Sequence, residues 1–378
     1  MIYFDNAATS YPKPPEVVKA VYDGIVRYGG NPGRSGHRMS LNAAKIIYNL
    51  REKAAEFFGI ADCEGIILTK NCTESLNLAI FSVLKNGGNA IVSNFEHNSV
   101  MRPLEYLKNN RNCSYKVAKV SFNDSNFTVK TFEKLIDNDT KMIICTHASN
   151  VTGKIAPIKE ISELCRRKNL IFCLDASQTA GIIPINMQKM GIDILCCPGH
   201  KGLFGPTGTG LLVLNLKMEL SPIIFGGTGS VSVSLEQPSF LPDVAESGTL
   251  NVPGAAGLSA GITFINRVGI ENIYAHEMEL ASYFYDKIAN MPNILTYSDE
   301  PSANTSVATV SFNVKGKACT DIADTLDRYN IAVRGGLHCA PLAHEFLGTS
   351  KTGTVRASFS YFNTKNEIDY LCNVLNRL

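Results

Sequence analysis

Short apolar runs alternate with helical patterns between residues 15 and 215 of the chain. Several runs are continuous rather than alternating, which is the pattern of strands buried on both faces of a sheet. Segments with an apolar spacing near 3.6, such as 15–28 and 158–168, lie between them. The alternation predicts a large α/β domain with a mostly parallel, doubly wound sheet and helices on both faces. The apolar runs are 65–69, 90–92, 142–145, 171–174, 192–197 and 210–214.

The pattern changes after about residue 255. A long helical pattern over 257–291 is followed by strands and helices in mixed order, which is typical of an α+β layer. A chain of 378 residues also exceeds the size at which single cores stop growing. We therefore expect a large domain over residues 15–255 and a small α+β domain formed by residues 1–14 and 256–378. The later segments are strands at 306–312, 331–333 and 354–358 and helices at 320–329 and 365–378.

The composition is that of an ordinary globular protein, with 45% hydrophobic and 19% charged residues. A net charge of +2 gives no electrostatic argument for nucleic acid or an acidic membrane. No apolar run reaches membrane-spanning length, and the N-terminus lacks the pattern of a signal peptide. We expect neither a nucleic-acid nor a membrane partner.

The cysteines indicate a reducing compartment. There are eleven of them, an odd number, and most lie inside apolar runs, where cysteine behaves as a small hydrophobic residue. None shows the spacing of a zinc site, so we expect no metal. The pattern favours a cytoplasmic protein.

The glycine-rich segment 198–208 places Lys201 after His200, just beyond the apolar run 192–197. The preceding run ends in an acid, Asp175. A lysine that forms a Schiff base and an acid that keeps a pyridine nitrogen protonated are what a pyridoxal phosphate (PLP) enzyme needs. Taken alone, a lysine here is more often a solvated loop residue. Asp175 and the residues described next favour the chemical role.

Further polar residues follow the ends of predicted strands, where ligands bind in open α/β sheets. Cys72 and Thr73 open a helix whose free N–H groups suit a phosphate, although a plain helix cap explains them equally well. His97 has a flat ring suited to stacking on a pyridine, but a lone histidine is more often structural. The Asn150 amide is suited to a phenolic oxygen or a substrate carboxylate. Two further candidate donors follow Asp175: Ser177 and Gln178.

This ordered set of motifs resembles the class V aminotransferase family and, within it, the cysteine desulfurases. The resemblance extends from Tyr3 to about Asp369 and implies PLP-dependent transferase fold type I. Its motifs here are Asp5-Asn6-Ala7-Ala8-Thr9, Cys72-Thr73-Glu74, Glu96-His97-Asn98, Ser149-Asn150-Val151-Thr152-Gly153, Asp175-Ala176-Ser177-Gln178, Gly199-His200-Lys201 and Ser247-Gly248-Thr249-Leu250-Asn251.

The resemblance implies a role for each matching residue. Lys201 would carry the Schiff base, Asp175 would pair with the pyridine nitrogen, and His97 would stack on the ring and handle protons. Gln178 and Asn150 would lie near the phenolic oxygen. The other implied cofactor contacts are Cys72, Thr73, Ser177 and His200, with Thr249 reaching the phosphate of a neighbouring subunit.

The segment 334–342 resembles the short catalytic loop of the second group of desulfurases, the sulfur-mobilisation and selenocysteine lyase type. The resemblance makes Cys339 the sulfur acceptor, and we expect His338 and Arg334 to favour its thiolate. Arg356 matches the arginine that binds the substrate α-carboxylate, a task suited to its guanidinium fork. Asn150 and Ala8 complete the implied substrate site.

Two segments depart from the family pattern. Pro198 occupies a position where many of these enzymes have a phosphate-binding serine, and Ser177 is the candidate replacement. The segment 31–37 follows the His-Arg-rich entrance segment of the sulfur-mobilisation enzymes only loosely. The resemblance therefore leaves one phosphate ligand and the choice of substrate open.

The resemblance implies a PLP-dependent cysteine desulfurase that converts L-cysteine to L-alanine and leaves a persulfide on Cys339. The implied context is sulfur metabolism, such as iron–sulfur cluster assembly, with a homodimer and a sulfur-acceptor protein as partners. Alternatives within the family are a selenocysteine lyase, another carbon–sulfur lyase and an aminotransferase. From other classes, a non-catalytic PLP- or nucleotide-binding module stays open, although both common nucleotide motifs are missing.

Overall fold

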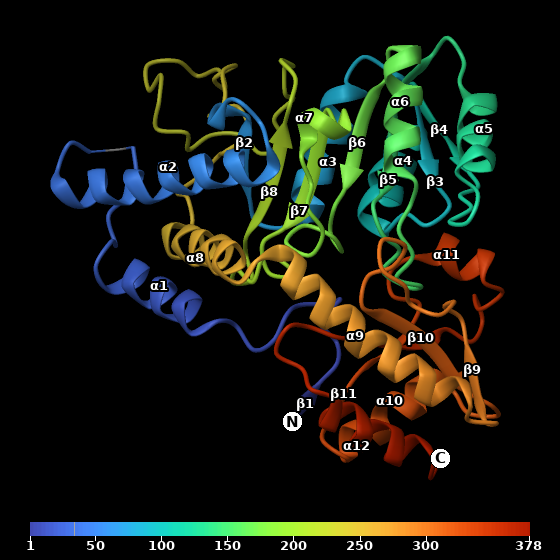
Figure 1. Ribbon diagram of the computed structural model, residues 1–378. Helices are drawn as coiled ribbons and strands as arrows, with labels where there is room; N and C mark the ends of the chain where they lie inside the picture. The colour runs from blue at the N-terminus through green and yellow to red at the C-terminus, as the bar shows by residue number, and fades with distance from the viewer. Residues whose placement is uncertain (34) are drawn as a thin grey trace.

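The computed structural model describes residues 1–33 and 35–378; Arg34, in the segment 31–37, lies outside the described residues. A seven-stranded sheet with the order β2-β8-β7-β6-β5-β3-β4 forms its centre (Figure 1). Neighbours from β7 to β4 are parallel, and β8 runs antiparallel to both β2 and β7. The prediction of a mostly parallel sheet is thus confirmed. The strands are β2 (Ile66–Thr69), β3 (Gly88–Ser93), β4 (Cys113–Ala118), β5 (Thr140–Thr146), β6 (Ile171–Asp175), β7 (Ile194–Pro198) and β8 (Gly210–Leu214).

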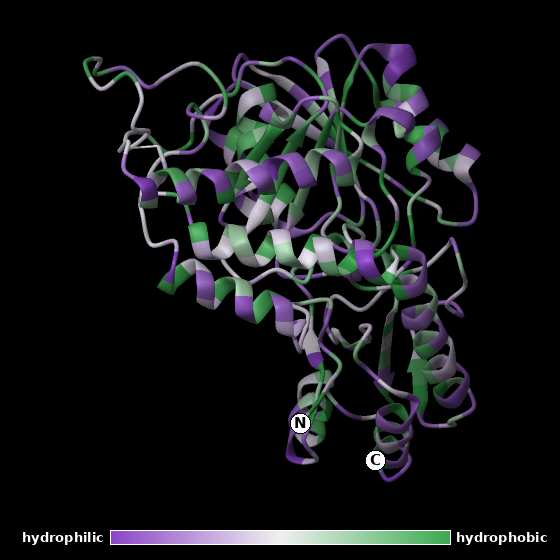
Figure 2. Ribbon diagram, turned by 60° about the vertical axis from the view of Figure 1, so that its left-hand side comes forward, coloured by the Kyte–Doolittle hydropathy of each residue, from purple (hydrophilic) through white to green (hydrophobic). Residues whose placement is uncertain are grey.

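Helices cover both faces of this sheet, and Figure 2 shows apolar strands enclosed by helices with polar outer surfaces. Alternate residues of one strand enter different cores: Phe172 and Leu174 of β6 belong to one core, and Cys173 to the other. Both faces therefore need apolar side chains, which explains the continuous apolar runs. One core takes in α3 (Cys72–Val83) and α4 (Asn98–Asn110), and the other takes in α2 (Arg38–Phe58), α5 (Ser125–Leu135), α6 (Ile158–Lys168), α7 (Met187–Met190) and α8 (Val252–Val268).

A four-stranded antiparallel sheet with the order β12-β13-β10-β9 builds a third core with the helices packed on it. The chain start joins this layer, because β1 pairs in parallel with β11 (Figure 1). Its strands are β1 (Ile2–Tyr3), β9 (Ile294–Thr296), β10 (Thr309–Val314), β11 (Ile331–Ala332), β12 (Arg334–Gly336) and β13 (Thr354–Ser358). The remaining helices are α1 (Pro15–Val26), η1 (Cys63–Gly65), α9 (Ile270–Ala289), α10 (Cys319–Arg328), α11 (Pro341–Phe346) and α12 (Lys365–Leu375).

The long helix predicted over 257–291 is two helices. Gly269, with φ +89°, ends α8, and α9 begins at the next residue. Glycine adopts this left-handed conformation without steric cost. The break matters because α8 lies in the core of the large sheet, whereas α9 carries side chains of the third core.

The segment 215–251 contains neither helix nor strand. It exposes several large apolar side chains, including those of Phe225, Val233 and Leu235. Among the described residues, no helix combines the length and the apolar character needed to cross a membrane.

Candidate active site

A cavity of about 230 Å³ opens at the carboxyl ends of the parallel strands, beside the third core. Thr146, Asp175 and Pro198, which end β5, β6 and β7, all line it. Because parallel strands end at one edge of the sheet, this is where the sequence placed the chemistry. The predicted site residues that line the cavity are Ala8, Cys72, Thr73, His97, Asn150, Asp175, Ser177, Gln178, His200, Lys201 and Arg356. Two do not line it: Cys339 and Thr249.

Lys201 lies in the tight loop that follows β7. A Cβ atom on Gly199 would come within 2.2 Å of the Thr209 hydroxyl, and one on Gly202 within 2.5 Å of the Ala180 carbonyl. The glycines thus let the loop pack closely beneath the lysine. Desolvation, reinforced by the nearby Arg356 guanidinium, lowers the pKa of Lys201 to about 8. At pH 7 about a tenth of the amine is therefore neutral and able to act as nucleophile or base, far more than for an ordinary lysine.

Asp175 ends β6 and is 2% exposed. Its Oδ1 accepts the Ser177 backbone N–H at 2.9 Å, and the Cys72 thiol approaches the same atom at 3.7 Å. The Ser177 hydroxyl in turn donates to Cys72 Sγ at 3.1 Å. Burial raises the pKa of the Cys72 thiol, so it stays protonated and acts as a donor beside the carboxylate. The carboxylate is held in one orientation at the base of the cavity.

The features beside Asp175 fit a phosphate. Asn71 caps α3 by accepting the Glu74 N–H at 2.9 Å. Asn71, Cys72 and Thr73 line the cavity, so the N-terminus of α3 lies at its wall. Burial lowers the pKa of His200 to about 4, and its Nδ1 is buried without a hydrogen-bond partner among the described residues. A buried ring nitrogen without a hydrogen-bond partner, close to a helix N-terminus, suits a bound group that carries oxygen atoms.

His97 is the N-cap of α4 and presents its ring to the cavity. Its Nδ1 accepts the Ser99 backbone N–H at 3.0 Å. Desolvation lowers the pKa of His97, so the ring is neutral and its proton sits on Nε2. The Ser99 hydroxyl, 2.8 Å from Nδ1, also contacts the Thr73 hydroxyl at 2.8 Å and connects the two residues predicted to touch ring and phosphate.

Arg356 on β13 is 1% exposed and reaches into the same cavity. Its Nη2 lies 2.7 Å from the Asp5 carboxylate, and its Nη1 donates to the Asn150 carbonyl at 3.0 Å. Its Nε is buried and has no partner among the described residues. A donor left free on a buried guanidinium fits a ligand carboxylate. Sequence reasoning assigned no role to Asp5, although this residue opens the first quoted motif.

Cys339 faces an adjoining groove of about 520 Å³ that shares Thr73, His97 and Ser99 with the cavity. Arg334 Nη2 lies 3.4 Å from Cys339 Sγ, as expected for a cation that favours a thiolate. The same expectation for His338 is wrong. Burial lowers the pKa of His338 to about 2, so its ring is neutral and supplies no positive charge.

Thr249 is exposed and lines another cavity, of about 110 Å³, where Asn31 Nδ2 approaches its hydroxyl at 3.4 Å. In a single chain it is therefore outside the cavity that holds Lys201. No group of three or more His, Cys, Asp and Glu side chains with metal-binding geometry occurs in the described part of the chain.

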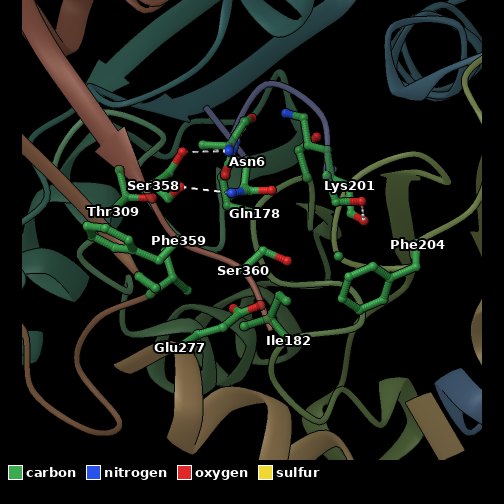
Figure 3. A pocket seen from close by; sticks show the side chains of 16 residues that line it. Asn6, Gln178, Ile182, Lys201, Phe204, Glu277, Thr309, Ser358, Phe359 and Ser360 are labelled. Atoms are coloured by element: carbon green, nitrogen blue, oxygen red, sulfur yellow. Dashed lines mark hydrogen bonds between the residues drawn. The ribbon is translucent and has the colours of Figure 1, made fainter. Parts of the chain in front are cut away.

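A further cavity, of about 40 Å³, shares Lys201 with the cavity at the carboxyl ends of the strands (Figure 3). Gln178 lines both cavities. The Ser360 hydroxyl is buried there without a partner among the described residues, and Figure 3 shows it between Gln178 and Glu277. Burial raises the pKa of Glu277 to about 8. The space is large enough for ordered water, which would satisfy these groups.

The chain belongs to the aminotransferase class V family, whose model matches residues 2–371. Among curated relatives, a probable cysteine desulfurase of Methanothermobacter thermautotrophicus is 33% identical over 100% of this chain and 94% of its own length. A probable cysteine desulfurase of Halalkalibacterium halodurans is also 33% identical, over 100% of this chain and 93% of its own. The solved apo structure of the cysteine desulfurase from Thermococcus onnurineus superimposes with a TM-score of 0.89 at 32% identity, covering 100% of this chain and 94% of that one.

Proposed function

We propose that this protein is a PLP-dependent cysteine desulfurase that converts L-cysteine to L-alanine and transfers the sulfur to Cys339 as a persulfide. The observation that carries the proposal is the convergence of Lys201, Asp175 and Arg356 on one cavity, with Cys339 at the adjoining groove. Family membership and the names of the relatives support it.

The residues of the cavity fit PLP. The α3 N-terminus, Thr73 and His200 would hold the phosphate, and Asp175 would pair with the pyridine nitrogen. When bound, PLP supplies an electron sink for the charge that develops on the substrate Cα. The neutral His97 ring would stack on the cofactor, and Lys201 would attach to it. Ser177 would replace the phosphate ligand that Pro198 cannot supply.

Three side chains would act on the substrate itself. Arg356 would hold the carboxylate through its free Nε. The Lys201 amine, set free when the substrate amine takes its place on the cofactor, would take the Cα proton. The Cys339 thiolate then bonds to the substrate sulfur while the bond between that sulfur and Cβ breaks, leaving the electron pair on carbon. The proton lost by Cys339 ends on Cβ and protonation at Cα is restored, so the step needs no external oxidant or reductant.

We further propose a homodimer that shares its sites. Exposed apolar side chains on α1 and on the segment 215–251 support an interface, as does the position of Thr249 outside its own chain's cavity. A sulfur-acceptor protein would take the persulfide from Cys339. The free state of all eleven cysteines supports a reducing, cytoplasmic setting.

A selenocysteine lyase is the second candidate, because the Cys339 loop resembles that type as well. The other carbon–sulfur lyases and the aminotransferases gain no support from a cysteine held beside Arg334. A non-catalytic binding module is disfavoured by the lowered pKa of Lys201, which a binding role does not require.

The test is the Cys339→Ala variant, compared with Cys113→Ala, which removes another half-buried cysteine that lines neither the cavity nor the groove. Cys339→Ala should keep the cofactor spectrum and lose alanine and sulfide production from L-cysteine, while selenium release from selenocysteine persists. Cys113→Ala should match the wild type. Mass spectrometry of wild type treated with L-cysteine should find one added sulfur on the Cys339 peptide. A persulfide on another cysteine, or normal desulfuration by Cys339→Ala, contradicts the mechanism.

A further inference from the structure

The loop that carries Cys339 is held in an unfavourable conformation. His338 and Cys339 have φ values of +50° and +56°, so two consecutive residues with side chains occupy the left-handed region. Residues other than glycine rarely adopt this region, and they persist there only where surrounding contacts hold them. The contacts that hold this loop therefore control where Cys339 points.

Two hydrogen bonds fasten the successive carbonyl groups of this pair. The Asn150 side-chain Nδ2 donates to the His338 carbonyl at 2.8 Å, and the Asn98 backbone N–H donates to the Cys339 carbonyl at 2.8 Å. On the other side of the loop, the His338 ring Nε2 lies 3.0 Å from the Thr354 carbonyl and hydroxyl oxygens. Of these three partners, only Asn150 lines the cavity that contains Lys201 and Arg356.

Asn150 also contacts the arginine proposed to bind the substrate. Its backbone carbonyl accepts from Arg356 Nη1 at 3.0 Å, so one residue joins Arg356 to the His338 carbonyl. The Asn150 amide has a second N–H and an oxygen left for the cofactor or substrate. A carboxylate arriving on Arg356 thus enters the same hydrogen-bond network that holds Cys339.

This hydrogen-bond network affects how Cys339 can reach a substrate bound to Arg356. Cys339 lines the outer groove and not the cavity that contains Lys201 and Arg356. The groove and the cavity share Thr73, His97 and Ser99, so a shift of the loop would bring Cys339 from the groove to a substrate held on Arg356. We propose that Asn150 is a positioning residue that ties the occupation of Arg356 to the Cys339 loop, so that a bound carboxylate releases Cys339 toward the cavity. The inference rests on the proposed role of Cys339 as sulfur acceptor.

The experiment measures alkylation of Cys339 by iodoacetamide in the holoenzyme, using mass spectrometry of its peptide. Saturating L-alanine, which has the carboxylate but no sulfur, should raise the wild-type rate about threefold or more. In Asn150→Ala the basal rate should already be raised, because a bond that holds the loop is gone, and L-alanine should change it no further. A cofactor absorbance titration sets the saturating concentration for each variant.

Thr354→Val is the matched control, since it loosens the His338 ring but leaves the Asn150 bonds in place. Its L-alanine effect should persist. Three results overturn the proposal: no rate increase with L-alanine in wild type, an increase that survives in Asn150→Ala, or loss of the effect in Thr354→Val as well. Failure of the proposed function is separate, because it shows as a missing Cys339 persulfide in wild type.

Discussion

The Asp5 carboxylate lies 2.7 Å from the Arg356 guanidinium, although 351 positions separate the two residues along the chain. Arg356 is 1% exposed, and a charge so deeply buried needs a partner. Asp5 therefore keeps the guanidinium oriented while leaving its Nε free for a ligand.

We expect Asp5→Asn to raise the KM for L-cysteine about tenfold or more, with a smaller change in kcat, because the arginine loses the charge that orients it. Steady-state kinetics would measure this split. Glu133→Gln removes the acid of an exposed ion pair with Lys168 and should leave both parameters unchanged. An unchanged KM in Asp5→Asn would show that the protein scaffold alone orients Arg356.

The assignment of Lys201 predicts a yellow protein. Borohydride reduction followed by peptide mapping should place a pyridoxyl group on Lys201 and on no other lysine. Lys201→Ala should lose the covalent link and turnover, because no other amine with a lowered pKa lines the described part of the cavity. A colourless protein that gains no visible absorbance with added PLP would end this interpretation.

Asp175→Ala removes the acid at the end of β6. We expect turnover to fall by orders of magnitude, because an unprotonated pyridine nitrogen is a poorer electron sink. The cofactor should still attach to Lys201, so absorbance spectra and kinetics separate binding from chemistry. Turnover near that of wild type would reduce Asp175 to a structural strand-end residue.

The raised pKa of Glu277 predicts that the stability of the protein depends on pH. Burial raises its pKa from 4.5 to about 8, so the folded state retains a proton that the unfolded state has lost. This contribution to the free energy of unfolding is fully present below about pH 4.5 and is lost as the pH rises toward 8.

We therefore expect Glu277→Gln, which stays neutral, to gain stability relative to wild type as the pH rises from 5 to 9, by on the order of a few kcal/mol. Thermal unfolding at pH 5, 7 and 9 would measure the trend. Glu279→Gln, at an exposed carboxylate on the same helix, should not reproduce it. A constant difference between Glu277→Gln and wild type across this range would mean that Glu277 is ionised in the folded protein.

The order of apolar and polar residues was sufficient to predict that Asp175 and Lys201 lie at the ends of buried strands. A strand buried on both faces is continuously apolar, so the first polar residues after it mark its end. Parallel strands end at one edge, so these residues had to meet there. The pattern could not reveal the helix break at Gly269, because apolar spacing near 3.6 continues across it.

The amino-acid order alone thus determined the sheet, its carboxyl edge and most side chains of the cavity, because these follow from periodicity along a strand or helix. The tertiary structure alone decided that Asp5 neutralises Arg356, that His338 is neutral and that Cys339 faces a groove outside the cavity. The burial of His338, the pairing of Asp5 with Arg356 and the direction of the Cys339 loop all depend on how the two sheets pack together. They join residues far apart in the chain, and no local pattern encodes them.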